Sequence, residues 1–196
     1  MRSSVKLLFA LVILAACGGS SHNDAPSQLD NACAIIAQRP AYLNAMKETE
    51  RKYGIPVASQ MAIIYQESKF RPQARTPVRY SLGVIPMGRQ SSAFGYSQAL
   101  DGTWEEYQRK TGNSWARRDR INDATDFMGW YMTITNERNG VALADTRNQY
   151  LAYHEGHTGY ARGSYNSKSW LVRVAGEVAD RAVMYDAQLR ACGRLS

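Results

Sequence analysis

Apolar side chains recur at helical spacing along most of the chain after residue 30. Residues 56–68 show this pattern most clearly, and Pro56 suits the first position of the helix that they predict. The positions that would share its buried face are Val57, Met61, Ile64 and Tyr65. This run ends on an acid, Glu67, about three turns after Val57, so its carboxylate would lie on the same inward face.

Six further helices are predicted from the same spacing and from residues that start or stop helices. They cover roughly 31–38, 40–53, 103–111, 121–138, a segment from Asp145 or Thr146 to Gly156, and 169–190. Asp30 and the pair Thr103 and Glu106 are candidate N-terminal caps. Gly54, Gly112 and Gly140 are candidate stops. We therefore expect a mainly α, single-domain fold.

Residues 69–94 differ from the rest because they show no sustained period and contain three prolines and two glycines. Their apolar side chains, among them Tyr80 and Leu82, argue against disorder. No strand or internal repeat is evident. The pattern therefore predicts a long irregular excursion, and such loops are usually functional. It could form the wall of a cleft.

The first residues are typical of an export signal. Arg2 and Lys6 precede an apolar run from Leu7 to Ala16, which is too short to span a bilayer. Leu-Ala-Ala-Cys at 14–17 resembles the lipobox of bacterial lipoproteins, which implies cleavage after residue 16 and a lipid on Cys17. The alternative is an ordinary secretory signal with an incidental cysteine. Residues 17–29 then form a polar tether, and residues 30–196 form the domain.

Charge and cysteine content refine this interpretation. The formal charge of +7 falls to +5 once residues 1–16 are removed, and a hydrophobic content of 44% indicates a globular chain. Cys33 and Cys192 remain, near opposite ends of the domain. In an oxidising compartment we expect a disulfide, which could stabilise the fold by about 4–5 kcal/mol. Two separate buried thiols are the alternative.

Three short segments carry candidate chemistry. They are Gln66-Glu67-Ser68, Gly95-Tyr96-Ser97-Gln98 and Ala152-Tyr153-His154-Glu155-Gly156. Glu67 taken alone could be an exposed acid at a frayed helix end. If it is instead partly buried, desolvation raises its pKa toward the value that a general acid needs.

In this order, the three segments resemble those of the lytic transglycosylase domain of the soluble type, which has a lysozyme-like fold. That family carries Glu-Ser at the end of a helix, a Gly-Leu-Met-Gln segment and an Ala-Tyr-Asn-x-Gly segment. The resemblance covers roughly residues 50–160. Tyr96-Ser97 replaces Leu-Met and His154-Glu155 replaces Asn-Ala. The distance in sequence from Glu67 to Gly95 is also longer than is usual in the family.

The resemblance implies cleavage of the bond between N-acetylmuramic acid and N-acetylglucosamine in peptidoglycan, without water or a cofactor. Glu67 would protonate the glycosidic oxygen and then accept the proton of the sugar's 6-hydroxyl, which closes a 1,6-anhydro ring. The residues implied to contact the glycan or the acid are Ser68, Tyr96, Gln98, Tyr153 and Glu155.

Each of these residues also has a purely structural interpretation. Tyr153 could be part of the core, Ser68 a helix cap and Gln98 a surface side chain. Glu155 could be a second carboxylate of the cleft, which would permit lysozyme-like hydrolysis, or could face solvent.

Two other groups of residues point weakly to other functions. His154, Glu155 and His157 depart from the His-Glu-x-x-His zinc motif, because the second histidine comes one residue early. We therefore expect no metal site, with a zinc peptidase as a distant alternative. Trp115 and the arginines at 117, 118 and 120 could contact nucleic acid, but they are more typical of a solvated face in an exported chain.

The sequence thus predicts a lytic transglycosylase that is anchored to the outer membrane by its lipid and faces the periplasm. Peptidoglycan strands are its expected partner, and nucleic acid is not. The alternatives are a hydrolase with the same cleft and a lipoprotein that binds the cell wall without catalysis.

Overall fold

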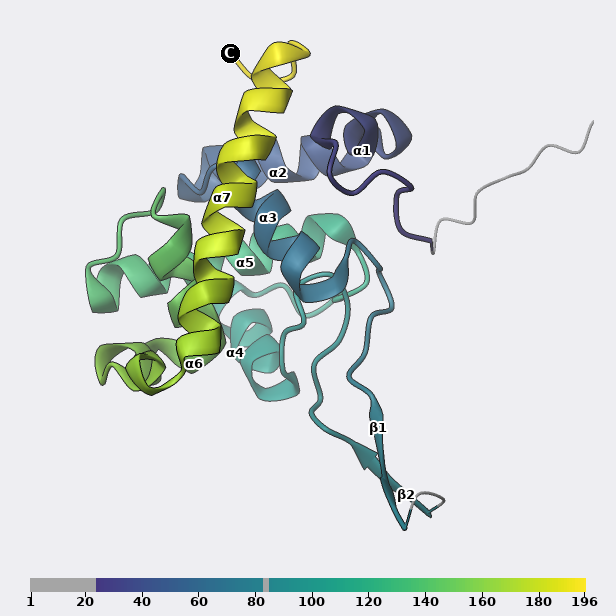
Figure 1. The fold of residues 1–196 in the computed structure, drawn as a ribbon, viewed down its shortest axis with the longest axis vertical. Coiled ribbons are helices and arrows are strands. Elements are labelled where there is room, and N and C mark those ends of the chain that lie inside the picture. Colours follow the sequence, from purple (N-terminus) through teal and green to yellow (C-terminus); the bar gives the residue numbers. More distant parts are fainter. Residues whose placement is uncertain (1–23, 83–84) are drawn as a thin grey trace, which may run out of the picture.

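The computed structural model describes residues 24–82 and 85–196, and helices make up most of this part of the chain (Figure 1). The mainly α class is thereby confirmed. In chain order the helices are α1 (Ala32–Gln38), α2 (Pro40–Tyr53), α3 (Val57–Ser68), α4 (Asp101–Thr111), α5 (Ile121–Asn139), α6 (Thr146–Ala161) and α7 (Ser169–Ala191). A short 3-10 helix, η1 (Ser164–Ser167), joins α6 to α7.

Helix α3 forms the centre of the core. Every residue from Val57 to Ile64 is buried, so the single apolar face predicted from the sequence is too narrow. A helix that is buried all round needs neighbours on several sides. The long helix α7 crosses α3 and packs along it, and α2 packs against both α3 and α5 (Figure 1). The position of Glu67 is therefore set by the best-buried element of the fold.

The predicted helix stops are confirmed, whereas three of the predicted starts are wrong. Pro56 precedes α3 as its N-cap and does not occupy the first helical position. Gly54, Gly112 and Gly140 all end their helices in the left-handed conformation. Helix α4 begins at Asp101 rather than at Thr103, because the carbonyl of Leu100 already accepts the amide of Trp104. The predicted capping box therefore does not form.

Helix α1 shows a similar shift of one residue at its start. The side chain of Asn31, not that of Asp30, accepts the amide of Ala34. Asp30 instead lies 2.7 Å from the guanidinium of Arg181 on α7. Asp145, one of the two candidates for the start of α6, does cap it by accepting the amide of Asn148.

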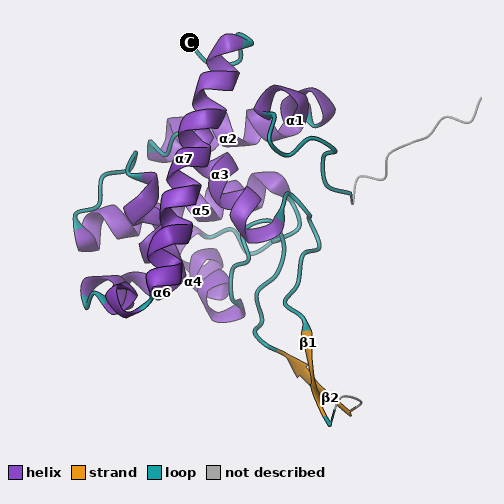
Figure 2. Ribbon diagram, viewed as in Figure 1, coloured by secondary structure: helices purple, strands orange, loops and turns teal. Residues whose placement is uncertain are grey.

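The excursion at 69–94 contains a β-hairpin that the sequence analysis did not predict. Strand β1 (Val78–Ser81) pairs with β2 (Ile85–Arg89) in antiparallel register, with an irregularity between Val78 and Tyr80 (Figure 2). That irregularity, together with Pro86 and Gly88, hides the two-residue alternation by which a strand is recognised. The hairpin projects away from the helical body (Figure 2).

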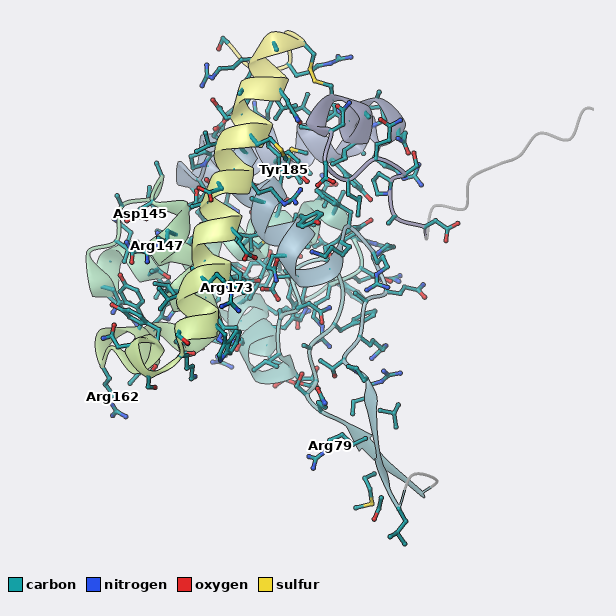
Figure 3. All side chains as sticks on the ribbon, in the orientation of Figure 1. Arg79, Asp145, Arg147, Arg162, Arg173 and Tyr185 are labelled. Atoms are coloured by element: carbon teal, nitrogen blue, oxygen red, sulfur yellow. A yellow bond between two sulfur atoms is a disulfide. The ribbon has the colours of Figure 1, made fainter. Side chains whose placement is uncertain are left out.

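The two ends of the domain are joined covalently. Cys33 on α1 forms a disulfide with Cys192, next to the end of α7, which confirms the predicted pairing. Tyr185 projects from α7 (Figure 3), and its hydroxyl donates to the carbonyl of Leu29. The side chain of Gln38 accepts the amide of Ser27. Residues 27–29 of the predicted tether therefore contact the domain.

The predicted signal peptide at 1–16 and the lipidation site Cys17 lie outside the described residues. Within the part of the chain that the structure describes, none of the helices is both long and apolar enough to cross a bilayer.

Candidate active site

Glu67 occupies the second-to-last position of α3 and is partly buried. Burial raises the pKa of its carboxyl to about 7, because the charged form loses hydration. A hydrogen bond from Tyr150 and the positive charge of Lys69 oppose this rise in pKa. The expected increase in pKa is thus confirmed. A carboxyl with a pKa near neutrality can hold a proton at physiological pH and release it to a substrate.

Two tyrosines on α6 interact with this carboxyl. Tyr150 is 3% exposed and hydrogen-bonds to Glu67. Tyr153, one turn later, feels the charge of Glu67, which together with burial raises the pKa of its hydroxyl far above the usual value. Both phenols therefore remain protonated and can act as donors. The sequence analysis overlooked Tyr150, although its spacing of three residues from Tyr153 places both on one face of the helix.

The turn at 95–98 is the third part of the site. Gly95 has a φ of 79°, and a Cβ there would lie 2.1 Å from the carbonyl oxygen of Arg118, so glycine is required. The side-chain amide of Gln98 donates to the carbonyls of Ala74 and Gly95, at 2.9 and 2.8 Å. These bonds fix the turn against the base of the excursion.

Tyr153 connects this turn to α6. Its hydroxyl donates to the carbonyl of Ser97 at 2.7 Å. Beside this bond lies a cavity of about 230 Å³. It is lined by Gln98, Ala99, Leu100, Thr103, Phe127, Tyr131, Tyr153, His154, Glu155 and Gly156. The cavity combines apolar and aromatic surface with a few polar groups, as sites for small organic groups generally do.

Comparison with known families agrees with this geometry. A family model described as "Transglycosylase SLT domain" matches residues 5–192. The chain belongs to this family. Membership confirms the resemblance drawn from the three segments and the lysozyme-like fold that it implied, and it indicates lytic transglycosylase activity on peptidoglycan in general terms. Among curated proteins, no significant match to the chain is found.

The second candidate acid, Glu155, lines this cavity and is held by partners. The Glu155 side chain is 3% exposed; Lys168 Nζ lies 2.7 Å and His154 Nδ1 3.1 Å from its Oε1, while Ser164 donates to Oε2. The hydrogen bonds from Lys168, Ser164 and His154 lower the pKa of Glu155 to about 2. The Glu155 side chain does not face solvent. It remains ionised at a pH at which Glu67 still holds its proton.

Helix α6 bends where these residues lie. Gly156 has φ 74° and ψ 157°, values outside the helical region, and the helix resumes after it. The prediction that Gly156 breaks the helix is therefore confirmed, although a second helical segment follows it directly. The mirror-image extended backbone is open to glycine at little cost. The bend lies next to Glu155 and separates Tyr150 and Tyr153 from His157.

Two of the predicted contact residues point elsewhere. Ser68 is 1% exposed and its hydroxyl donates to the carbonyl of Ile64 at 3.1 Å. The Tyr96 hydroxyl lies 3.0 Å from that of Tyr42, and Tyr96 lines a different cavity, beside the start of α2. The structure therefore brings Gln98, Tyr153 and Glu155 to one cavity, but it places Tyr96 away from them and uses the Ser68 hydroxyl within α3.

The histidines near the bend do not converge on one point. His154 contacts Glu155, and its ring centroid lies 5.3 Å from that of Trp170. The His157 ring stacks on Tyr131 at 4.2 Å, and burial lowers its pKa. Among the described residues, no cluster of three or more His, Cys, Asp or Glu could hold a metal ion.

The arginines near residue 117 belong partly to ion pairs. Arg117 lies 2.8 Å from Asp119, and Arg118 lies 2.7 Å from Asp101. Arg118 also donates to the carbonyls of Ser92 and Ala99, so it braces the segment that leads into α4. These contacts favour a structural role over a nucleic-acid surface.

Proposed function

We propose that the protein is a peptidoglycan lytic transglycosylase in which Glu67 acts first as an acid and then as a base. The observation that carries the proposal is the state of this one carboxyl. Its pKa of about 7 lets it hold a proton, and two protonated tyrosines on α6 interact with it, Tyr150 through a hydrogen bond and Tyr153 through its charge. Acid and base catalysis of this kind contributes about 10²–10⁴ in rate.

In the first step, protonated Glu67 donates to the oxygen that joins N-acetylmuramic acid to N-acetylglucosamine. The bond from C1 of the muramic acid to that oxygen breaks, and the ring acquires positive charge. In the second step, the 6-hydroxyl of the same sugar attacks C1 and gives its proton to the Glu67 carboxylate. Water is not consumed, and the product ends in a 1,6-anhydro ring.

The tyrosines and the turn at 95–98 position the reacting groups in this scheme. Tyr150 hydrogen-bonds to Glu67 and stabilises the ionised form that exists between the two steps. Tyr153 holds the carbonyl of Ser97, which keeps the turn against α6. Gln98 and the aromatic side chains of the cavity are the groups that we propose to contact the glycan.

The masses of the products test this proposal. Purified sacculi are digested with the full chain, and the released muropeptides are analysed by mass spectrometry. We expect 1,6-anhydromuramic ends, which are lighter by one water than reducing ends. Reducing ends alone would mean that water attacks C1 and that the protein is a hydrolase. Glu67→Gln should release nothing while still binding sacculi, whereas equal release by both forms would mean that another group is the acid.

We also propose that residues 1–16 are removed on export and that a lipid on Cys17 anchors the enzyme to the periplasmic face of the outer membrane. The apolar run and the Leu-Ala-Ala-Cys segment support this location. Mass spectrometry of the N-terminal peptide of the mature protein should show Cys17 as the first residue, with diacylglycerol attached. An unmodified Cys17, or a chain that still carries residues 1–16, would contradict the lipid anchor.

A further inference from the structure

The positive charge of the domain is concentrated in the excursion that carries the hairpin. Of the 24 Lys and Arg residues, two lie in 1–16 and five in 69–100, so the remaining 17 equal the 17 Asp and Glu residues in number. The five are Lys69, Arg71, Arg75, Arg79 and Arg89. Residues 69–100 contain no acid, so they account for the whole net charge of residues 17–196.

Within the described residues, none of the ion pairs includes any of these five cations, although the charge of Lys69 interacts with those of Asp30 and Glu67. Arg75 stacks over Phe94 at 4.0 Å, and Arg89 donates to the carbonyl of Thr76 at 2.6 Å, and neither of these partners carries a negative charge. Arg79 projects from β1 on the outer part of the hairpin (Figure 3). The described part of the arm, residues 75–82 and 85–92, therefore presents positive charge that no ion pair compensates.

Beyond the arginines, the same arm exposes large apolar side chains. Leu82, directly after β1, is 88% exposed, and Met87 on β2 is 65% exposed. Arg89 pairs with Val78 at the start of β1, whereas Arg79 lies in the irregular part of the ladder, at the level of Met87 and before Leu82. The arm thus carries its arginines, the basic collar, below and beside its apolar end, Leu82 and Met87.

The hairpin has little support from the rest of the protein. Its strands pair with each other, and it extends away from the helices (Figure 2). A two-stranded hairpin without a packed face is only marginally stable in water. A surface that accepted the apolar end and neutralised the collar would stabilise it.

We propose that this arm docks on an anionic phospholipid surface, with Leu82 and Met87 entering the boundary of the acyl chains and Arg79 and Arg89 contacting the head groups. Arginine suits this position, because its apolar stem can lie along the acyl chains while its guanidinium stays among phosphates. Basic residues are attracted to anionic leaflets, and exposed apolar side chains gain by leaving water.

A lipid surface explains both features of the arm. The carboxylates of peptidoglycan stem peptides would account for attraction to the arginines, but they offer nothing to Leu82 and Met87. The lipid proposal is independent of the chemistry at Glu67. It adds a second membrane contact to the predicted anchor, on an element whose two ends lead directly into the Glu67 helix and the turn at 95–98.

Quenching of fluorescence by brominated lipid tests the proposal on the full chain. A tryptophan is introduced by Leu82→Trp, and vesicles are made of equal parts phosphatidylglycerol and phosphatidylcholine brominated on its acyl chain. The signal of the four native tryptophans, measured on the unaltered chain, is subtracted. Val183→Trp is the matched control, because Val183 is another exposed apolar residue, at 72%, on α7. Any effect of the N-terminal segment is the same in both variants.

We expect the tryptophan at position 82 to be quenched severalfold more strongly than the one at position 183. Quenching at 82 should fall when Arg79→Gln and Arg89→Gln are added, when the vesicles are zwitterionic, or when salt is raised. Equal quenching at both positions would overturn the proposal, as would quenching at 82 that is indifferent to loss of both arginines. If the arginine changes weaken binding to sacculi but not quenching, the partner of the arm is the cell wall and not the lipid.

Discussion

Glu67 on α3 and Glu155 on α6 behave in opposite ways. Glu67 is partly buried, with a neutral hydrogen-bond partner and the charge of Lys69 nearby, and burial raises its pKa to about 7. The side chain of Glu155 is 3% exposed, yet an ammonium, a hydroxyl and an imidazole hold its oxygens and lower its pKa to about 2. Burial alone therefore does not decide protonation; the number and charge of the partners do. The difference separates a group that can exchange protons from one that supports structure.

Exchanging each carboxylate for its amide should reveal the largest contrast. Glu67→Gln should lower the rate of muropeptide release by about 10²–10⁴, because the proton donor is lost. Glu155→Gln should keep the rate within a few-fold of the original, measured at a temperature where both variants are folded. A loss of similar size in both variants would show that Glu155 takes part in the chemistry and that the contrast is wrong.

The pH dependence of the rate should report Glu67. Its carboxyl must be protonated at the start, so kcat/KM should fall about tenfold per pH unit above a pKa of about 7. Glu155 titrates near 2, and the same alkaline limb should therefore persist in Glu155→Gln. The measurement is release of soluble fragments from sacculi across a pH series. If the alkaline limb moves or vanishes in Glu155→Gln, then the limb reports the ionisation of Glu155 and not that of Glu67.

Stability should change in opposite directions in the two variants. The raised pKa of Glu67 means that its ionisation weakens the fold as pH rises from its ordinary value of 4.5 to about 7. Glu67→Gln should therefore stabilise the protein by about 1–2 kcal/mol at about pH 8 and have little effect at about pH 4. Urea unfolding at both pH values measures this, and no gain at the higher pH would count against the buried acid.

Glu155 contributes with the opposite sign. Its lowered pKa means that stability is present above 4.5 and is lost as pH falls toward 2. Glu155→Gln should cost about 1–3 kcal/mol at neutral pH, because Lys168 and Ser164 lose a charged acceptor. The difference from the unaltered protein should shrink below pH 4.5, and a constant difference would mean that shape and not charge is responsible.

The smallest effect is expected at Tyr150. Its hydrogen bond lowers the pKa of Glu67, so Tyr150→Phe should raise that pKa further and move the alkaline limb of the rate to higher pH. The change in rate at neutral pH should be a few-fold. Tyr160→Phe, which removes a hydroxyl bonded to Asn148 on the same helix, is the control and should leave the limb in place. Equal pH profiles for both variants would show that Tyr150 does not influence the pKa of Glu67.

Much of the helical frame could be predicted because its signals are local. Gly54, Gly112 and Gly140 end helices through a backbone conformation that glycine adopts readily, and Asp145 caps the helix that follows it. The raised pKa of Glu67 could also be predicted, because its spacing from Val57 directs it inward. Such inferences depend on residues within a few turns of one another.

The parts that could not be predicted depend on distant contacts. Glu155 meets Lys168 and Ser164 only because the chain turns back through η1, and Tyr96 meets Tyr42 across 54 positions. The hairpin lacks a regular alternation, and its pairing is visible only in three dimensions. The segment motifs therefore identified the region of the site, whereas the direction of each side chain required the structure.

The disulfide has a consequence for how the protein is made. Cys33 lies on the first helix and Cys192 follows the last, 159 positions later, so their bond can form only after nearly the whole chain has been synthesised. Release of a chain that stops before residue 192 would leave α1 and α7 without their covalent link. The bond thus marks completed chains, and a shift in mobility on non-reducing gels would distinguish finished protein from truncated fragments in the cell.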